Sequence, residues 1–194
     1  MNAIAEMPVE KLRQIMASFN SHPNKGRALE HFCAVFFSAL PGVNVAHHNL
    51  FDDAHSQELD LLLENDQHPA GLDMLKPHIF VEAKNWRAPV GSAEVAWLDW
   101  KIRMGGSDVD GILVVANGVT GRPEESTSAW NILQWAHREQ RRIFVLSPTE
   151  MLGCTTSEHV RQLIKRKKLR LVAGNAPLDA SEVRNPLAPS IANP

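Results

Sequence analysis

The chain has 194 residues, of which 44% are hydrophobic and 22% are charged, as is typical of a globular protein with one sizeable core. No apolar run approaches the length of a membrane span, and the first residues lack the basic and apolar regions of a signal peptide. The formal net charge of −2 indicates no class of partner by itself. Cys33 and Cys154 form no CxxC motif, so we expect buried thiols in the reducing cytoplasm rather than a disulfide framework.

The N-terminal part of the chain is expected to be helical. Residues 8–18 show modest helical periodicity, and a stronger helix follows, for which Asn24 is the candidate N-cap and Pro41-Gly42 the end. The apolar stripe of this second helix consists of Leu29, Phe32, Cys33, Phe36 and Leu40.

Three strands are expected next, at residues 43–51, 58–64 and 78–84. The turn-rich stretch 52–57 (DDAHSQ) separates the first two strands, and a polar loop precedes the third. We expect these three strands to form an antiparallel meander.

Helices and strands alternate in the second half. A helix is predicted from the spacing of Ala93, Ala96, Trp97, Trp100 and Met104. A buried strand at 110–116, a helix around 129–136, a strand at 141–147 and a helix at 157–168 follow. This alternation predicts right-handed crossovers and parallel pairing, hence an α/β fold. We expect a single domain over residues 1–172 and a flexible, proline-rich tail over 173–194.

Acidic residues lie at two neighbouring strands of the predicted sheet. In 58–64, alternation places Leu59, Leu61 and Leu63 on the core face and Asp60 on the other. The next strand ends in Glu82-Ala83-Lys84, so Glu82 and Lys84 share a face. If the two strands pair, Asp60 and Glu82 approach each other across the ladder. Two carboxylates at such a short distance repel each other unless a cation lies between them. Mg²⁺ prefers oxygen ligands of this kind.

Lys84 beside such an ion could orient the attacking water or stabilise charge developing on a phosphate. Glu30 lies at the border of the apolar stripe of the second predicted helix, where a partly solvated carboxylate needs a partner.

With these residues in place, the sequence resembles the PD-(D/E)xK nuclease superfamily, and within it the Mrr-type restriction endonucleases and Holliday-junction-resolvase-like nucleases. The stretches KGRALE, VEAKNW and DGILVVANG, in that order, support the resemblance, which spans about residues 20–152. It implies a restriction-endonuclease-like fold, a mixed central β-sheet flanked by α-helices. It also implies Asp60, Glu82 and the Ala83 carbonyl as metal ligands, Lys84 as the catalytic lysine and Glu30 as an auxiliary acid.

The sequence departs from the family pattern at Leu59, where the superfamily name has proline. It has Glu82 where Mrr-type enzymes often have glutamine, and this is the commoner superfamily form. An E-x-K in a strand, taken alone, is more often a surface ion pair than a catalytic element. Asp60 and Glu30 on neighbouring elements favour the catalytic interpretation. Glu58 shares the face of Asp60 and is interpreted as a charge at the strand edge or one that supports the ligands from behind, with direct ligation as the alternative.

Several polar and aromatic residues near this site have alternative interpretations. The stretch 47–55 (HHNLFDDAH) matches no zinc motif and is interpreted as a solvated turn, with DNA contact and metal binding as weaker alternatives. Asn85 either holds water or phosphate or merely ends the strand. Trp86 either stacks on a base or packs an edge. Trp97 and Trp100, three residues apart, are interpreted as core residues, with a stacking platform as the weaker alternative.

A basic run near the C-terminus is a candidate nucleic-acid surface, because residues 160–170 carry six basic and no acidic side chains. The residues predicted to contact phosphates are Asn85, Arg161, Lys165, Arg166, Lys167 and Lys168. Arg138, Arg141 and Arg142 extend this set. The alternative is a solvated helix face.

The sequence therefore predicts a Mg²⁺-dependent DNA endonuclease, with Mn²⁺ able to substitute, in restriction, antiphage defence or DNA repair. Cutting both strands would need two sites, so a homodimer is one hypothesis, and partner proteins of a defence or repair system are another. Two alternatives stay open: a non-catalytic DNA-binding or assembly module with a nuclease-like fold, and a nuclease acting on RNA or branched DNA. No P-loop motif for nucleotide hydrolysis is present.

Overall fold

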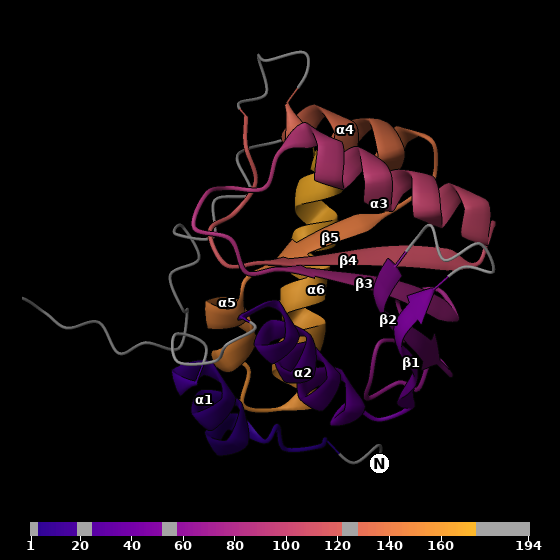
Figure 1. Cartoon of the computed structure of the whole chain (residues 1–194). Helices are drawn as coiled ribbons and strands as arrows, with labels where there is room; N and C mark the ends of the chain where they lie inside the picture. Colours follow the sequence, from indigo (N-terminus) through magenta and orange to yellow (C-terminus); the bar gives the residue numbers. More distant parts are fainter. Residues whose placement is uncertain (1–3, 19–24, 52–57, 122–127, 174–194) are drawn as a thin grey trace, which may run out of the picture.

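The structure is a computed structural model that describes residues 4–18, 25–51, 58–121 and 128–173. Its core is a single five-stranded sheet in the order β1-β2-β3-β4-β5, with helices on both faces (Figure 1). The strands are β1 (Val43–Phe51), β2 (Glu58–Asn65), β3 (His78–Lys84), β4 (Val109–Val115) and β5 (Ile143–Leu146). The predicted N-cap Asn24, the turn at 52–57 and the tail beyond residue 173 lie outside the described residues.

The pairing of the strands is as predicted. β1, β2 and β3 form an antiparallel meander, and β3, β4 and β5 pair in parallel. The parallel connections need crossovers, which α3 (Ser92–Gly105) and α4 (Ala129–Arg138) supply on one face of the sheet. The protein is therefore an α/β protein with a mixed sheet.

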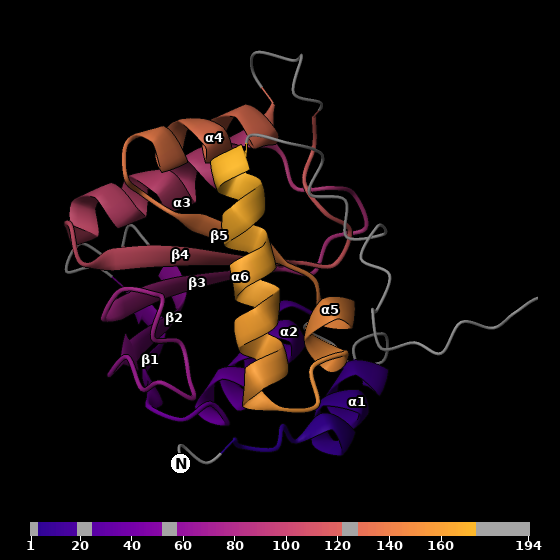
Figure 2. The same cartoon turned by 180° about the vertical axis from the view of Figure 1, so that it is seen from behind.

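The other face of the sheet is covered by α1 (Val9–Ala17), α2 (Lys25–Ser38) and α5 (Pro148–Leu152). The long helix α6 (Ser157–Ala173) packs against β5 and α4, on the side of the sheet away from β1 (Figure 2). The short helix α5 is absent from the sequence prediction, although its signal is present. Ser147 and Glu150 form a capping box around Pro148 at the start of α5.

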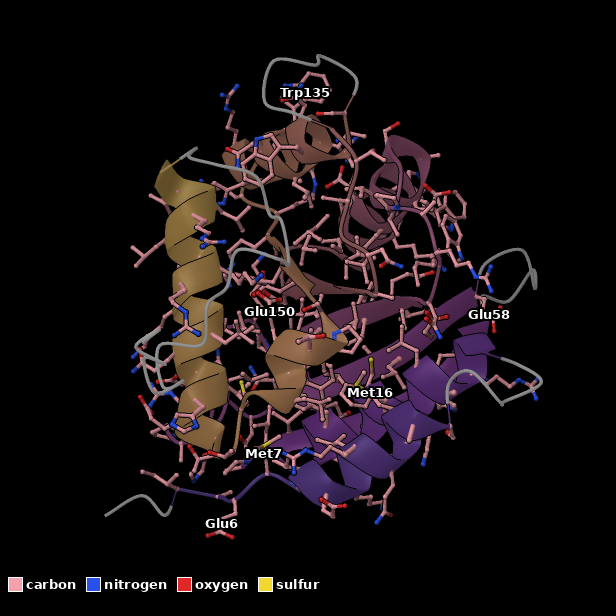
Figure 3. All side chains as sticks on the ribbon, turned by 90° about the vertical axis from the view of Figure 1, so that its left-hand side faces the viewer. Glu6, Met7, Met16, Glu58, Trp135 and Glu150 are labelled. Atoms are coloured by element: carbon pink, nitrogen blue, oxygen red, sulfur yellow. The ribbon has the colours of Figure 1, made fainter. Side chains whose placement is uncertain are left out.

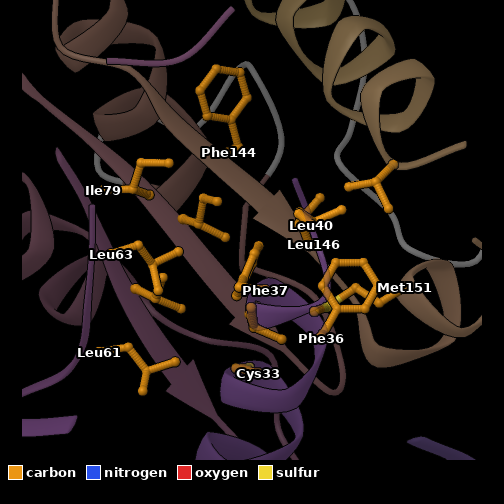
Figure 4. Packing of buried hydrophobic residues seen from close by; sticks show 14 of the residues in the cluster. Cys33, Phe36, Phe37, Leu40, Leu61, Leu63, Ile79, Phe144, Leu146 and Met151 are labelled. Atoms are coloured by element: carbon orange, nitrogen blue, oxygen red, sulfur yellow. The ribbon is translucent and has the colours of Figure 1, made fainter. Parts of the chain in front are cut away.

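Two apolar cores hold these layers together. The larger lies between the sheet and α2, where Phe36 and Phe37 meet the leucines of β2 (Figure 4). The smaller lies between the sheet and α3 and α4, around Leu98 and Leu133. Alternation along β3 assigns its side chains to the two faces: Val81 and Ala83 belong to the larger core, whereas Phe80 packs against the smaller one. Glu82 and Lys84 therefore lie on the α3 face of β3.

The structure corrects the orientation of α3. The predicted apolar stripe of this helix faces solvent, and Trp97 and Trp100 are exposed rather than core residues. The buried side is formed instead by Val95, Leu98 and Ile102, together with Lys101. Periodicity identified the helix correctly but selected the wrong one of its two apolar stripes.

Cys33 and Cys154 are both buried and neither forms a disulfide. Among the described helices, none combines the length and the apolar character required to traverse a bilayer.

Candidate active site

The candidate site lies where β2 and β3 separate. Their ladder runs from the Glu64–His78 pair to the Leu61–Val81 pair. The next position along β2 is Asp60, and its Oδ2 accepts a hydrogen bond from the backbone N–H of Ala83 at 2.6 Å. The carboxylate of Asp60 thereby satisfies a main-chain donor of β3 at the end of the ladder. This contact holds Asp60 directly against the Glu82-Ala83-Lys84 segment, as the sequence predicted.

Glu82 lies between two ammonium groups. Lys84 Nζ is 2.6 Å from Glu82 Oε1, and Lys101 Nζ is 2.9 Å from Glu82 Oε2. Lys101 also donates a hydrogen bond to the backbone carbonyl of Glu58 in β2. A single lysine from α3 thus bridges the two separating strands.

Lys101 is the functional residue that sequence reasoning missed. Its side chain is only 5% exposed, and its charge is matched by the carboxylate of Glu82. The signal was available in principle, because Lys101 follows Val95 and Leu98 at helical spacing and adjoins Ile102. A lysine on the buried stripe of a helix needs a buried anion, and Glu82 is that anion.

Glu30 reaches the same cluster from α2. Its Oε2 lies 3.8 Å from His48 Nε2 on β1, which is too far for a hydrogen bond. This buried oxygen has no hydrogen-bond partner among the residues that the structure describes. Burial raises the pKa of Glu30, and so does the charge of Glu58, whereas His48 acts in the opposite direction. Arg27 and Lys84 also lower the pKa of Glu30, so what the carboxylate lacks among the described residues is a hydrogen-bond donor to Oε2.

The pKa shifts at the site reflect its closely spaced acidic side chains. Burial, followed by the charge of Glu82, raises the pKa of Asp60 to about 7, although the Ala83 N–H and Lys84 partly oppose the shift. Burial alone would lower the pKa of Lys84, but the charge and hydrogen bond of Glu82 outweigh it and the pKa is raised. Lys84 consequently stays protonated at neutral pH, while Asp60 is poised to bind either a proton or a metal ion.

The donor set fits a hard divalent cation. Asp60 and Glu82 offer carboxylate oxygens, and Glu30 Oε2 is a buried oxygen without a donor. Within the described ranges, no group of three or more His, Cys, Asp or Glu side chains converges closely enough to enclose an ion by itself.

The predicted nucleic-acid residues are not all available. Lys167 is wrongly predicted, because its side chain is 3% exposed and its Nζ is 2.6 Å from the buried carboxylate of Glu150. Arg161 is half-buried and bound to Asp73 and Glu158. Two of the additional arginines are likewise occupied: Arg141 pairs with Asp99 and Glu139, and Arg142 pairs with Asp110. Arg138 is exposed on α4.

The remaining basic residues lie away from the acidic cluster. Lys165 and Arg166 are exposed and Lys168 is half-exposed on α6. Figure 3 labels Glu58 on the side of the molecule opposite α6, so the basic helix does not border the acids. Asn85 and the exposed Trp86 follow β3 directly and remain next to Lys84. Of the 47–55 stretch, His48 is placed beside Glu30, while residues 52–55 lie outside the described residues.

Comparisons with protein-family models, with curated proteins and with solved structures found no match to this chain. The functional interpretation therefore depends on the arrangement of Asp60, Glu82, Lys84, Lys101 and Glu30. Lys84 and Lys101 each form an ion pair with Glu82. Asp60 is held by a hydrogen bond from the backbone N–H of Ala83, which lies between Glu82 and Lys84 in the sequence.

Proposed function

We propose that this chain is a Mg²⁺-dependent DNA endonuclease of the PD-(D/E)xK type with a restriction-endonuclease-like fold. The observation that carries the proposal is the hydrogen bond from Ala83 N–H to Asp60, which sets an acid of β2 against the E-x-K element of β3. The mixed sheet, with an antiparallel meander leading into parallel crossovers, is compatible with this fold. The excess of buried acid, expressed in the raised pKa of Asp60, supports a cation as the missing partner.

In this proposal Asp60 and Glu82 hold the ion, with the Ala83 carbonyl as a further ligand. A bound Mg²⁺ would lower the pKa of a water molecule and polarise the scissile phosphate. Glu82 shares its oxygens with two lysines, so it holds both ammonium groups next to the place where the phosphate binds.

Lys84 acts as a cation rather than as a base. Its pKa is raised above the ordinary value because Glu82 holds the protonated form, so it remains charged at neutral pH. A charged ammonium positions the attacking water or stabilises the negative charge that develops on the phosphate. Glu30, from α2, adjusts the charge of the site from the opposite side and is the remaining oxygen donor.

A plasmid-nicking assay tests the function. Wild-type protein should nick supercoiled DNA with Mg²⁺ or Mn²⁺ and not with EDTA. Asp60→Asn keeps an acceptor for the Ala83 N–H but removes the charge, and Lys84→Ala removes the cation; each should lower the rate by at least about a hundredfold. Glu64→Gln is the matched control, since Glu64 is an exposed acid further along the same strand.

Equal rates for the wild type and both site variants would exclude the nuclease and favour a non-catalytic DNA-binding or assembly module. Nicking that is lost in Glu64→Gln as severely as in Asp60→Asn would also contradict the assigned site. Supplying RNA and branched DNA in the same assay decides the substrate. The homodimer, the partner proteins and a role in defence or repair remain predictions.

A further inference from the structure

Two tryptophans form an exposed stacked pair on the outer face of α3. Trp97 and Trp100 are 44% and 36% exposed, and their rings lie 5.0 Å apart between centroids with an interplanar angle of 6°. Exposed indoles are costly because they leave a large apolar surface in water. The two rings stack face to face, so one face of each indole is covered by the other ring and the remaining exposed surface of the pair is aromatic.

Trp97 lies on the side of α3 that faces the candidate site, whereas Trp100, next to Lys101 in the sequence, points to solvent. Asp99 pairs with Arg141 and Arg103 pairs with Glu139, which defines the side of the helix next to α4. Lys101 points the other way, toward Glu82. Trp97 is four residues before Lys101, so the two side chains are neighbours one turn apart on the helix surface.

A third exposed tryptophan borders the site from the end of β3. Trp86 is 44% exposed and follows Lys84 by two residues, and the exposed Arg87 comes directly after it. Aromatic rings thus occur beside each of the two lysines that bind Glu82. Trp135, which is 69% exposed on α4, is the described exposed tryptophan that has no such neighbour.

We infer that Trp97 and Trp100 form a stacking platform for unpaired bases, so that the substrate of the neighbouring site is single-stranded or locally unpaired DNA. The inference deepens the proposed nuclease function and rests on it. A base stacks on an aromatic ring only where its own face is free, which excludes the interior of an intact duplex. The platform joins the site through Lys101, and this continuity favours nucleic acid over a protein partner for this face.

Binding measured in EDTA tests the platform without cleavage. Wild-type protein is titrated with an oligo-dT single strand and with a duplex of equal length, and binding is followed by fluorescence anisotropy of the labelled DNA. The single strand should bind more tightly than the duplex. The double variant Trp97→Leu with Trp100→Leu should weaken single-strand binding by about ten- to a hundredfold, because it removes the rings and keeps an apolar surface.

Two further variants make the result specific. Trp97→Phe with Trp100→Phe retains aromatic rings and should lose less affinity than the leucine variant. Trp135→Leu removes a more exposed indole away from the site and should bind within about twofold of the wild type. Circular dichroism establishes that each variant is folded.

The remaining outcomes are distinguishable. Cleavage by the wild-type protein is measured in Mg²⁺ beside its binding in EDTA. If that binding is present but wild-type protein never cleaves, the platform stands and the nuclease proposal fails. Unchanged binding in the leucine variant overturns the platform. A wild-type dimer that dissociates in this variant, with DNA binding unaffected, would assign the face to a second copy of the chain and likewise overturn the inference.

Discussion

Two buried acidic clusters lie at opposite ends of the parallel strands, and they differ in how their charge is matched. At the start of β4, Asp110 is fully buried and accepts hydrogen bonds from Arg142 Nε at 2.9 Å and Arg142 Nη2 at 2.5 Å. The backbone N–H of Lys76 adds a third bond at 2.9 Å, and its ammonium lies 3.9 Å away. In this cluster one carboxylate is surrounded by cations and donors.

At the end of β3 the balance is reversed. Asp60, Glu82, Glu30 and the nearby charge of Glu58 face the ammonium groups of Lys84 and Lys101, while His48 and Arg27 act on Glu30. Burial and the charge of Glu82 raise the pKa of Asp60 to about 7. Removing one partner of a fully paired buried acid is costly, whereas an excess of like charge destabilises a fold unless a ligand is bound. The contrast fits a structural role for Asp110 and supports the proposed ligand-binding role of the β2–β3 cluster.

Breaking the saturated cluster should have the largest effect. Asp110→Ala would leave the guanidinium of Arg142 partly buried without its anion, which we expect to lower the free energy of unfolding by about 3–5 kcal/mol. Urea denaturation followed by circular dichroism measures the loss. Mg²⁺ should not restore it, because the cluster has no excess acid. A loss of less than about 1 kcal/mol would mean that Asp110 does not have the structural role assigned to it.

A smaller effect is expected when Lys101 is removed from the acid-rich cluster. Lys101→Met deletes hydrogen bonds to Glu82 and to the Glu58 carbonyl, and because Glu82 keeps Lys84 we expect a loss of about 1.5–3 kcal/mol in EDTA. The variant leaves the acids with fewer cations, so Mg²⁺ should raise its melting temperature more than that of the wild type.

Lys167→Met is the matched control for this prediction, because Lys167 is an equally buried lysine paired with the single acid Glu150. It should lose comparable stability and gain none from Mg²⁺. If both lysine variants respond to Mg²⁺ alike, the metal does not act through the β2–β3 cluster. If neither variant loses stability, the two ammonium groups do not contribute as assigned.

The sequence predicted those elements that local patterning determines. The strands at 43–51 and 78–84 match β1 and β3, because each is bounded by turn or loop residues and has a regular apolar pattern. Asp60, Glu82 and Lys84 were identified from alternation on adjacent strands, and they do lie together. What brings Asp60 to Ala83, however, is the separation of β2 from β3, and a pairing register cannot be read from either strand alone.

The errors share one physical cause, which is that a helix can carry more than one stripe. In α3 the exposed tryptophans form an apolar stripe of their own, and it competes with the buried side that contains Leu98 and Lys101. In α6 the basic run conceals a buried stripe of Val160, Leu163, Ile164, Lys167 and Leu171. Lys101 was missed and Lys167 was wrongly predicted to contact nucleic acid, because a lysine on such a stripe is explained only by its anion on another element.

The last way to sharpen the comparison is the pH dependence of Asp60. Its pKa is about 7 in the folded protein and near 3.9 in an unfolded chain, so the folded state binds this proton more tightly. Stability therefore falls as pH rises from about 4 to about 7, by at most about 1.4 kcal/mol per pH unit. Asp60→Asn cannot ionise but keeps an acceptor for the Ala83 N–H.

Without metal, Asp60→Asn should be more stable than the wild type by about 1–2 kcal/mol near pH 8, and the advantage should disappear near pH 4. Urea denaturation in EDTA at the two pH values measures the difference, with Glu64→Gln as the exposed control on the same strand. Asp60→Asn should therefore stabilise the protein at pH 8, whereas Asp110→Ala should destabilise it, although both variants remove a buried carboxylate. Mg²⁺ should then reverse the order, because it binds the ionised Asp60 of the wild type and stabilises only that protein. A variant that is less stable than the wild type at both pH values would mean that Asp60, like Asp110, is a saturated structural acid.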